Sequence, residues 1–158
     1  MLNLFRRKAT PPDAQALLKA LIAEVEGRYT WWLFDPRDST VAQEVLAAAP
    51  ETQRAFVLAA VAWLRHHRNL PMYDPRVVPI RKTMLALLRH RLPLEHDDVL
   101  ALLDWSLHER ANGTRGAAQM IKVAESYIKQ HPDAPKVRDG LRQLARAIES
   151  GYCQAQDR

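Results

Sequence analysis

The chain of 158 residues contains one cysteine and five glycines. Because Cys153 has no second cysteine in the chain to pair with, a disulfide scaffold is excluded and nothing indicates an oxidising compartment. Runs of alternating β-branched residues are almost absent, and the low glycine content fits helices joined by short turns. We therefore expect an all-α protein, and we expect it to be cytoplasmic.

Long apolar runs are also missing. No stretch approaches the roughly 20 apolar residues that a membrane-spanning helix needs, so we expect no stable membrane insertion. Residues 1–12 have the character of a flexible basic N-terminus and lack the apolar core of a secretory signal. Residues 152–158 resemble a C-terminal tail. One helical-repeat domain is predicted between them, over residues 13–151.

Apolar residues recur at helical spacing along most of this domain. Asp13, Ser39 or Thr40, and Asp133 are suitable N-caps, and Pro79 should lie in the opening turn of its helix, where a missing amide costs little. The aromatic segment 29–36 has no helical period and is predicted to be an extended connector. The predicted helices cover residues 13–27, 39–48, 50–68, 76–91, 95–110, 114–130 and 133–150.

A pattern of apolar positions occurs twice, 40 to 41 residues apart. The first copy aligns with the second as follows: Val77, Ile80, Met84, Leu87 and Leu88 with Ala117, Met120, Ala124, Tyr127 and Ile128, and Leu100, Leu103 and Leu107 with Leu141, Leu144 and Ile148. Self-similarity at this period is typical of an α-solenoid, in which neighbouring helix pairs bury one another's apolar faces. We predict a short α-solenoid of about three antiparallel helix pairs, preceded by an N-terminal helix.

Residues 80–104 combine a basic helix, a Leu-Pro-Leu break, an acidic cap and a leucine-rich helix. In this order of features the segment resembles repeats of the HEAT and armadillo-like superfamily, and in particular the helical part of large uncharacterised bacterial proteins. The resemblance covers residues 39–150 and is strongest over 76–110. It implies a curved surface that binds partners, typically lined by the second helix of each pair, and it says little about activity.

Basic residues recur at regular spacing on the last two predicted helices. Arg138, Arg142 and Arg146 recur every four residues opposite the apolar stripe of the last helix, which predicts one exposed ridge. Lys122 and Lys129 lie seven residues apart on the preceding helix. These cations either cover apolar helix flanks and keep the protein in solution, or they form a surface that contacts a partner.

A second basic group belongs to the helix predicted over 76–91, which carries Arg81, Lys82, Arg89 and Arg91. A continuous basic face would require these residues and the ridge to share one side of the molecule. The net charge is +5, but the basic segment 65–91 is followed by an acidic one. The charge pattern therefore fits a protein partner of mixed charge as well as a polyanion.

Tryptophans are the other candidate contact residues, because exposed tryptophans anchor many interfaces. An extended connector turns Trp31 and Trp32 to opposite sides, so one of them is expected to pack inward and the other to be accessible. Trp63 and Trp105 fall beside leucine positions and are expected in the core or half-buried.

Motifs for chemistry are weak. Among the six histidines, the most usable spacing is that of His108 with Asp104, which offers at most two metal ligands from one helix. Cys153 lies in the tail, and no serine sits in a strained or glycine-rich turn. We predict no metal, no cofactor and no catalytic residues.

The sequence leaves three functional hypotheses. The first is a non-catalytic protein–protein interaction or scaffold module of HEAT-like type, acting as a monomer or weak homo-oligomer on an unidentified protein partner. The alternative is a nucleic-acid-binding helical-repeat protein that uses a basic face. The third, an enzyme of unrecognised type, is motivated only by the unassigned histidine and aspartate residues.

Overall fold

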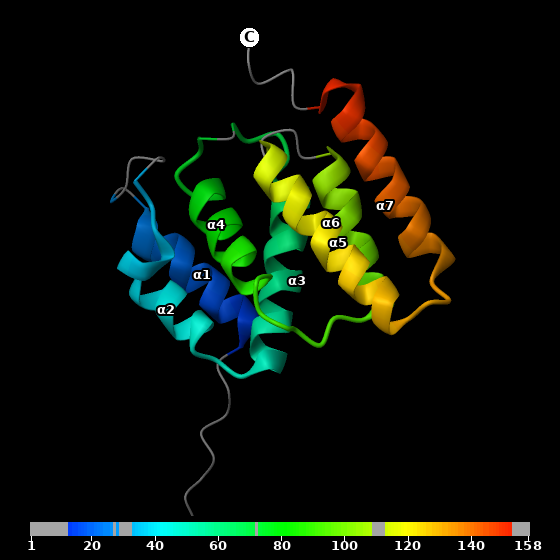
Figure 1. Ribbon diagram of the computed structural model, residues 1–158. Coiled ribbons are helices and arrows are strands. Elements are labelled where there is room, and N and C mark those ends of the chain that lie inside the picture. Colours follow the sequence, from blue (N-terminus) through cyan, green and yellow to red (C-terminus); the bar gives the residue numbers. More distant parts are fainter. Residues whose placement is uncertain (1–12, 27, 29–32, 72, 109–112, 153–158) are drawn as a thin grey trace, which may run out of the picture.

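The computed structural model describes residues 13–26, 28, 33–71, 73–108 and 113–152. All regular secondary structure in these ranges is helical, which confirms the all-α prediction (Figure 1). The α-helices are α1 (Ala14–Val25), α2 (Thr40–Leu46), α3 (Pro50–His66), α4 (Val77–Leu87), α5 (His96–His108), α6 (Gly113–Gln130) and α7 (Pro135–Ala147). A short 3₁₀ turn, η1 (Pro36–Asp38), precedes α2, and a π-helical turn, η3 (Ile148–Tyr152), follows α7.

Two of the predicted N-caps are confirmed. The Asp13 carboxylate accepts a hydrogen bond from the Gln15 amide at 3.1 Å, and the Ser39 hydroxyl accepts one from the Ala42 amide at 3.0 Å. The predicted cap at Asp133 is wrong: α7 begins two residues later, with Ala134 at the cap position and no side-chain cap. Pro135 fixes this start, because proline suits the first helical position, where no amide is needed.

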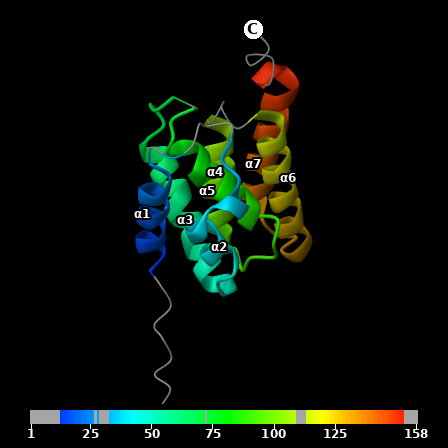
Figure 2. The same ribbon diagram turned by 90° about the vertical axis from the view of Figure 1, so that its left-hand side faces the viewer.

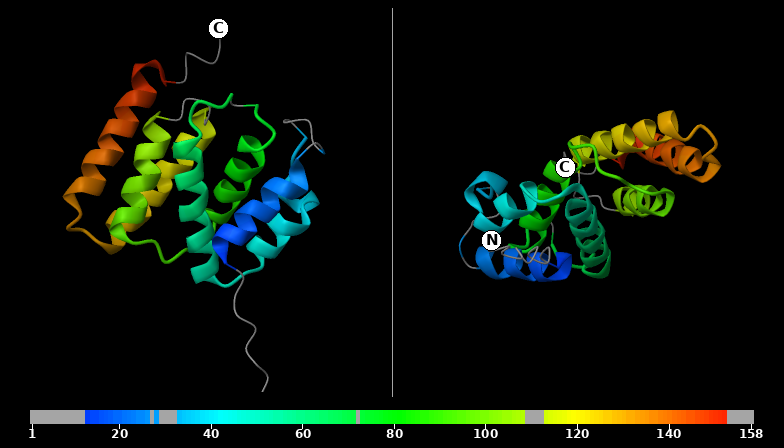
Figure 3. Two further views of the ribbon diagram at one scale, coloured as in Figure 1. Left: turned by 180° about the vertical axis from the view of Figure 1, so that it is seen from behind. Right: turned by 90° about the horizontal axis from the view of Figure 1, so that it is seen from below.

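The helices pack both with sequential neighbours and with helices two apart in the chain. α3 lies between α1 and α5, and α7 packs against both α5 and α6 at the end of the stack. On the other face, α2 is followed by α4 and then α6 (Figures 1 and 3). The view in Figure 2 places α1 and α6 on opposite sides of the molecule. Six of the seven helices thus form two rows of three, and α7 closes one end.

The segment that joins α4 to α5 departs from its prediction. Instead of continuing to Arg91, α4 ends at Leu87, and residues 88–95 cross to α5 without helical structure (Figure 1). Pro93 prevents a helix through this segment. Leu88, Leu92 and Leu94 pack against the core instead of extending a helix stripe. As a result, α4 packs chiefly against α3 and α1, while α5 packs against α6 and α7.

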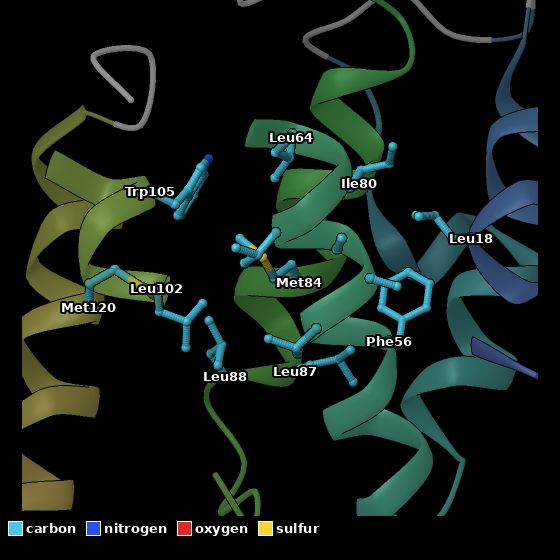
Figure 4. Packing of buried hydrophobic residues seen from close by; sticks show 14 of the residues in the cluster. Leu18, Phe56, Leu64, Ile80, Met84, Leu87, Leu88, Leu102, Trp105 and Met120 are labelled. Atoms are coloured by element: carbon cyan, nitrogen blue, oxygen red, sulfur yellow. The ribbon is translucent and has the colours of Figure 1, made fainter. Parts of the chain in front are cut away.

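One contiguous apolar core runs from α1 to α7. Phe56 of α3, Met84 of α4 and Met120 of α6 are almost completely buried in it (Figure 4). Trp105 is 2% exposed and Trp63 is half-buried, as predicted. Because each large apolar side chain contributes about 1.5–3 kcal/mol when buried, this shared core is the main source of stability.

Glycine allows the close approach of α7 to α5. A Cβ atom built on Gly140 would lie 3.0 Å from the Cδ1 methyl of Leu103, a distance that only a shift of that side chain could relieve. Leu103 is itself 3% exposed and enclosed by the core. Any side chain at position 140 therefore requires Leu103 to shift, and a β-branched side chain requires a larger shift than the single Cβ of alanine.

The Glu24 side chain joins α1 to the start of α2. Its carboxylate accepts hydrogen bonds from the Ser39 hydroxyl at 2.6 Å and from the amides of Thr40 and Val41 at 2.8 and 3.1 Å. Partial burial acts to raise the pKa of Glu24, but these hydrogen bonds outweigh it and hold the pKa below 4.5. The N-terminus of α2 also stabilises this negative charge, because the helix dipole is positive at that end.

We predict that Glu24→Gln lowers the free energy of unfolding by about 1 kcal/mol at neutral pH, the usual effect of losing a helix cap. Since the folded-state pKa lies below the ordinary 4.5, the contribution is present above that pH and is lost as pH falls through the folded pKa. Urea titrations near pH 7 and pH 3 measure both effects. The exposed Glu44→Gln is the matched control; equal losses in the two variants at pH 7 would contradict the capping role.

We predict that Gly140→Val lowers the free energy of unfolding by about 2 kcal/mol, because the new side chain overpacks the contact with Leu103. The melting temperature should fall by about 4–8 °C for a chain of this size. Gly140→Ala should be nearly neutral, since a gain in helix propensity of about 1 kcal/mol offsets a smaller clash. Gln143→Val, on the exposed side of α7, controls for valine's helix propensity. If Gln143→Val lowers the free energy of unfolding as much as Gly140→Val, the loss does not arise from the contact between position 140 and Leu103.

Candidate functional site

A groove of about 1200 Å³ opens between α4 and α6. α4 forms one wall, α6 the other, and residues 88–94 of the connection close the side between them. η1 and the preceding Phe34 border the groove near the start of α4. Its position follows from the fold, because α4 and α6 succeed each other in one row while their main packing contacts are with the other row.

Apolar side chains form the floor of the groove. Leu88 and Val99 are buried there, and Leu85 on α4 and Val123 on α6 are half-buried. The amide of Gln119 on α6 donates a hydrogen bond to the Leu85 carbonyl at 2.6 Å, which ties the two walls together. The groove therefore offers a preformed apolar surface.

Four cations surround this floor. Lys82 lies on the α4 wall, Arg89 and Arg91 on the connection, and Lys122 on the α6 wall. Lys82 donates a hydrogen bond from Nζ to the Phe34 carbonyl at 2.8 Å, and its side chain is half-buried. Arg89, Arg91 and Lys122 are exposed and have no ion-pair partner among the described residues.

The carboxylate at the groove border is already neutralised. Asp35 accepts three hydrogen bonds from the Arg37 guanidinium, the shortest from Nη2 at 2.7 Å, and one from the Arg37 amide. These contacts, led by the side-chain hydrogen bonds, lower the pKa of Asp35 to about 2. The Asp35–Arg37 pair has no net charge. The positive charge of the groove therefore comes from the four cations named above, Lys82, Arg89, Arg91 and Lys122.

An aromatic residue lines the far end of the α6 wall. Tyr127 stacks on His131 with ring centroids 4.3 Å apart, and His96 lies 6.3 Å from the same ring. The stacking restricts the Tyr127 ring, which borders the groove with one face. A fixed aromatic edge adds to the apolar surface available to a ligand.

The arginine ridge predicted on the last helix exists as an exposed feature of α7. Arg138, Arg142 and Arg146 are all exposed, and the apolar residues opposite them are buried or half-buried. Two of the three have intramolecular partners, however. Arg138 donates to the Pro132 carbonyl at 2.7 Å, and Arg142 lies 3.3 Å from Asp139.

The structure divides the predicted cations between two hollows. A shallow hollow of about 390 Å³ between α6 and α7 is lined by Lys129, Arg138 and Arg142, around Ile128 and Leu141. Lys122 instead lines the groove between α4 and α6, and Arg146 lines neither. The seven-residue spacing of Lys122 and Lys129 thus places them along an outer edge of α6 that separates the two hollows.

Several other arginines hold helices together. Arg54 on α3 pairs with Asp98 at 2.8 Å and with Glu95 at 3.4 Å, both at the start of α5. Asp98 also accepts the Glu95 amide at 2.8 Å, as in a capping box. Through these contacts the acidic residues after the Leu-Pro-Leu break cap α5 and join it to α3.

Asp104, which motivated the enzyme hypothesis, also has a structural partner. It pairs with Arg65 of α3 at 3.0 Å, and the His108 ring contacts its backbone carbonyl at 2.8 Å. Within the described ranges, no three His, Cys, Asp or Glu side chains are grouped so that they could hold a metal ion. Trp31 and Trp32, the other predicted contact residues, lie outside the described residues.

Sequence reasoning selected one residue of the groove, Lys122, for the candidate site. Lys82 and Lys122 occupy equivalent positions of the 40-residue repeat, so the sequence allowed a shared basic face. It did not predict that Arg89 and Arg91 lie beyond the end of the helix and border the same groove. Only the end of α4 at Leu87 turns Arg91 and the leucines of the connection toward α6.

No protein-family model, curated protein or solved structure matches the chain. None of the helices in the described ranges is both long enough and apolar enough for a membrane crossing. The functional interpretation therefore depends on the geometry of the groove and on its charges.

Proposed function

We propose that this protein is a non-catalytic interaction module that binds a protein partner in the groove between α4 and α6. The observation that carries the proposal is a preformed apolar floor surrounded by cations that have no ion-pair partner among the described residues. Apolar contact surface supplies most of the affinity in a protein interface, and charges at its edge select and orient the partner. The groove combines both features.

A HEAT-like repeat architecture is part of the same proposal. It is supported by the positions that repeat at 40 residues: Ile80 and Met84 on α4, like Met120 and Ala124 on α6, are buried toward the core. It is also supported by the two rows of helices, since solenoids bury such faces between successive pairs. The proposed binding surface lies on the row that contains α4 and α6, which are the first helices of the two predicted pairs, whereas the resemblance implies a surface on the second helices.

We predict that Arg89→Glu combined with Lys122→Glu strongly weakens partner capture, because it reverses the charge on the connection and on the α6 wall of the groove. Tagged protein is used to capture partners from a lysate of the source cells, and quantitative mass spectrometry compares the variants. Proteins that bind in the groove should fall at least about tenfold, which corresponds to about 1.4 kcal/mol.

The matched control is Arg142→Glu combined with Arg146→Glu, which makes the same change in charge on the exposed ridge of α7. Circular dichroism should show both double variants folded, with little change in melting temperature, because surface ion pairs contribute little stability. Equal loss of partners from both variants would indicate a response to net charge alone. Retention of every partner by a folded groove variant would rule out the groove as the binding surface.

Nucleic-acid binding is the second candidate, and the observation that favours it is the four cations around the groove. If all four contact phosphates, affinity should fall about 10²-fold between about 50 and 200 mM salt. Fluorescence anisotropy with labelled single-stranded DNA, duplex DNA and RNA measures this dependence. Binding that is steeply salt-dependent and lost in the groove variant would replace the protein partner with a polyanion; no binding at the lower salt would exclude this candidate.

A further inference from the structure

The shape of the groove limits what can occupy it. Its volume of about 1200 Å³ exceeds the range of about 300–1,000 Å³ that is usual for small-molecule pockets. Both walls are helices, and the described residues contain no sheet edge to which an extended strand could be added. Strand addition is therefore excluded at this groove, and a helix lying between helical walls is the mode that an apolar floor with cations on both sides favours.

The apolar floor indicates which face of such a helix would enter. Leu85 on α4 and Val123 on α6 approach from opposite walls, with Leu88 and Val99 between them. A helix that binds in this way presents one narrow apolar stripe, with contacts at positions i, i+3, i+4 and i+7. Its remaining faces stay in water or contact the edges of the groove.

The charges at those edges indicate what should flank the stripe. Lys82 borders the α4 side, Lys122 the α6 side, and Arg89 and Arg91 the connection between the walls. Carboxylates on both sides of the apolar stripe would face these cations, whereas lysines or arginines there would be repelled. Charge complementarity therefore favours an acidic occupant.

Neither segment 1–8 nor the described surface of a second copy has the features of this occupant. The segment 1–8 contains leucines and a phenylalanine, but it carries Arg6, Arg7 and Lys8 and no carboxylate. On the described surface, the large apolar side chains that are exposed are Leu33 and Tyr73, and both lie in turns, so a second copy presents no apolar helix stripe there. Charge complementarity therefore favours an occupant supplied by another protein.

We infer that the groove between α4 and α6 binds an acidic amphipathic helix of a partner protein, an inference that rests on the proposed function. The apolar stripe of that helix packs on Leu85, Leu88 and Val123. Its flanking carboxylates pair with the cations of both walls. Selectivity arises from the requirement that apolar spacing and charge occur together in one segment.

A display library of random peptides of about 16 residues, long enough for about four helical turns, tests the inference directly. Selection uses the wild-type protein, with counter-selection on Arg89→Glu combined with Lys122→Glu. We expect enriched sequences with apolar residues at i, i+3, i+4 and i+7, flanked by Asp and Glu. Groove-dependent sequences that are proline-rich, basic or without helical spacing overturn the inference, as does the absence of any groove-dependent sequence.

An enriched peptide is then compared with two matched peptides: one with its carboxylates replaced by lysine, and one with the same composition in scrambled order. Anisotropy should show at least about tenfold weaker binding for both, and for the wild-type peptide on the groove variant. The α7 ridge variant, Arg142→Glu with Arg146→Glu, should bind unchanged. Circular dichroism should show helix gained on binding. Equal affinity for the original and scrambled peptides contradicts the inference.

The two levels of the proposal fail in different ways. If lysate partners are lost from the groove variant but display yields no acidic helix, the groove binds proteins and only the identity of the occupant is wrong. If neither partners nor peptides depend on the groove, the proposed function fails together with the inference.

Discussion

α4 ends at Leu87, and the eight residues that follow reach α5 without forming another helical turn. Because Pro93 blocks a helix there, the leucines of the connection pack sideways against the core instead of continuing the stripe of α4. With the connection packed in this way, a groove is left open between α4 and α6. The groove, its apolar floor and the position of Arg91 all depend on it.

The rest of the fold stabilises this arrangement from behind. α3 packs against α4, and α5 and α7 pack against α6, so each wall of the groove is held from behind by other helices of the same core. Gly140 lets α7 approach α5 closely, and Glu24 fixes the start of α2. Since protein interiors are close-packed and respond little to surface changes, a preformed groove of this kind loses little entropy on binding.

The arginines fall into two groups that explain how stability and binding coexist. Arg54 and Arg65 pair with acidic residues of α5 and join α3 to it, whereas Arg89 and Arg91 point outward at the groove with no such partner among the described residues. Charges that are already paired gain little from a ligand, while unpaired charges beside an apolar surface gain a partner when a complementary segment binds. This division supports the groove over the α7 ridge, where Arg138 and Arg142 are already engaged.

The sequence by itself determined the local features: the all-α class, the caps at Asp13 and Ser39, the start of α3 at Pro50, and the burial of Trp105. These depend on neighbours three or four residues away, which periodicity and capping chemistry report directly. Only the tertiary structure decided where α4 stops, which cations meet across the groove, and that Asp104 pairs with Arg65. Lys82 and Lys122 are 40 residues apart, which is one repeat period, so the repeat relates their positions in the sequence. That both side chains border one groove depends on the packing of both helices on a common core.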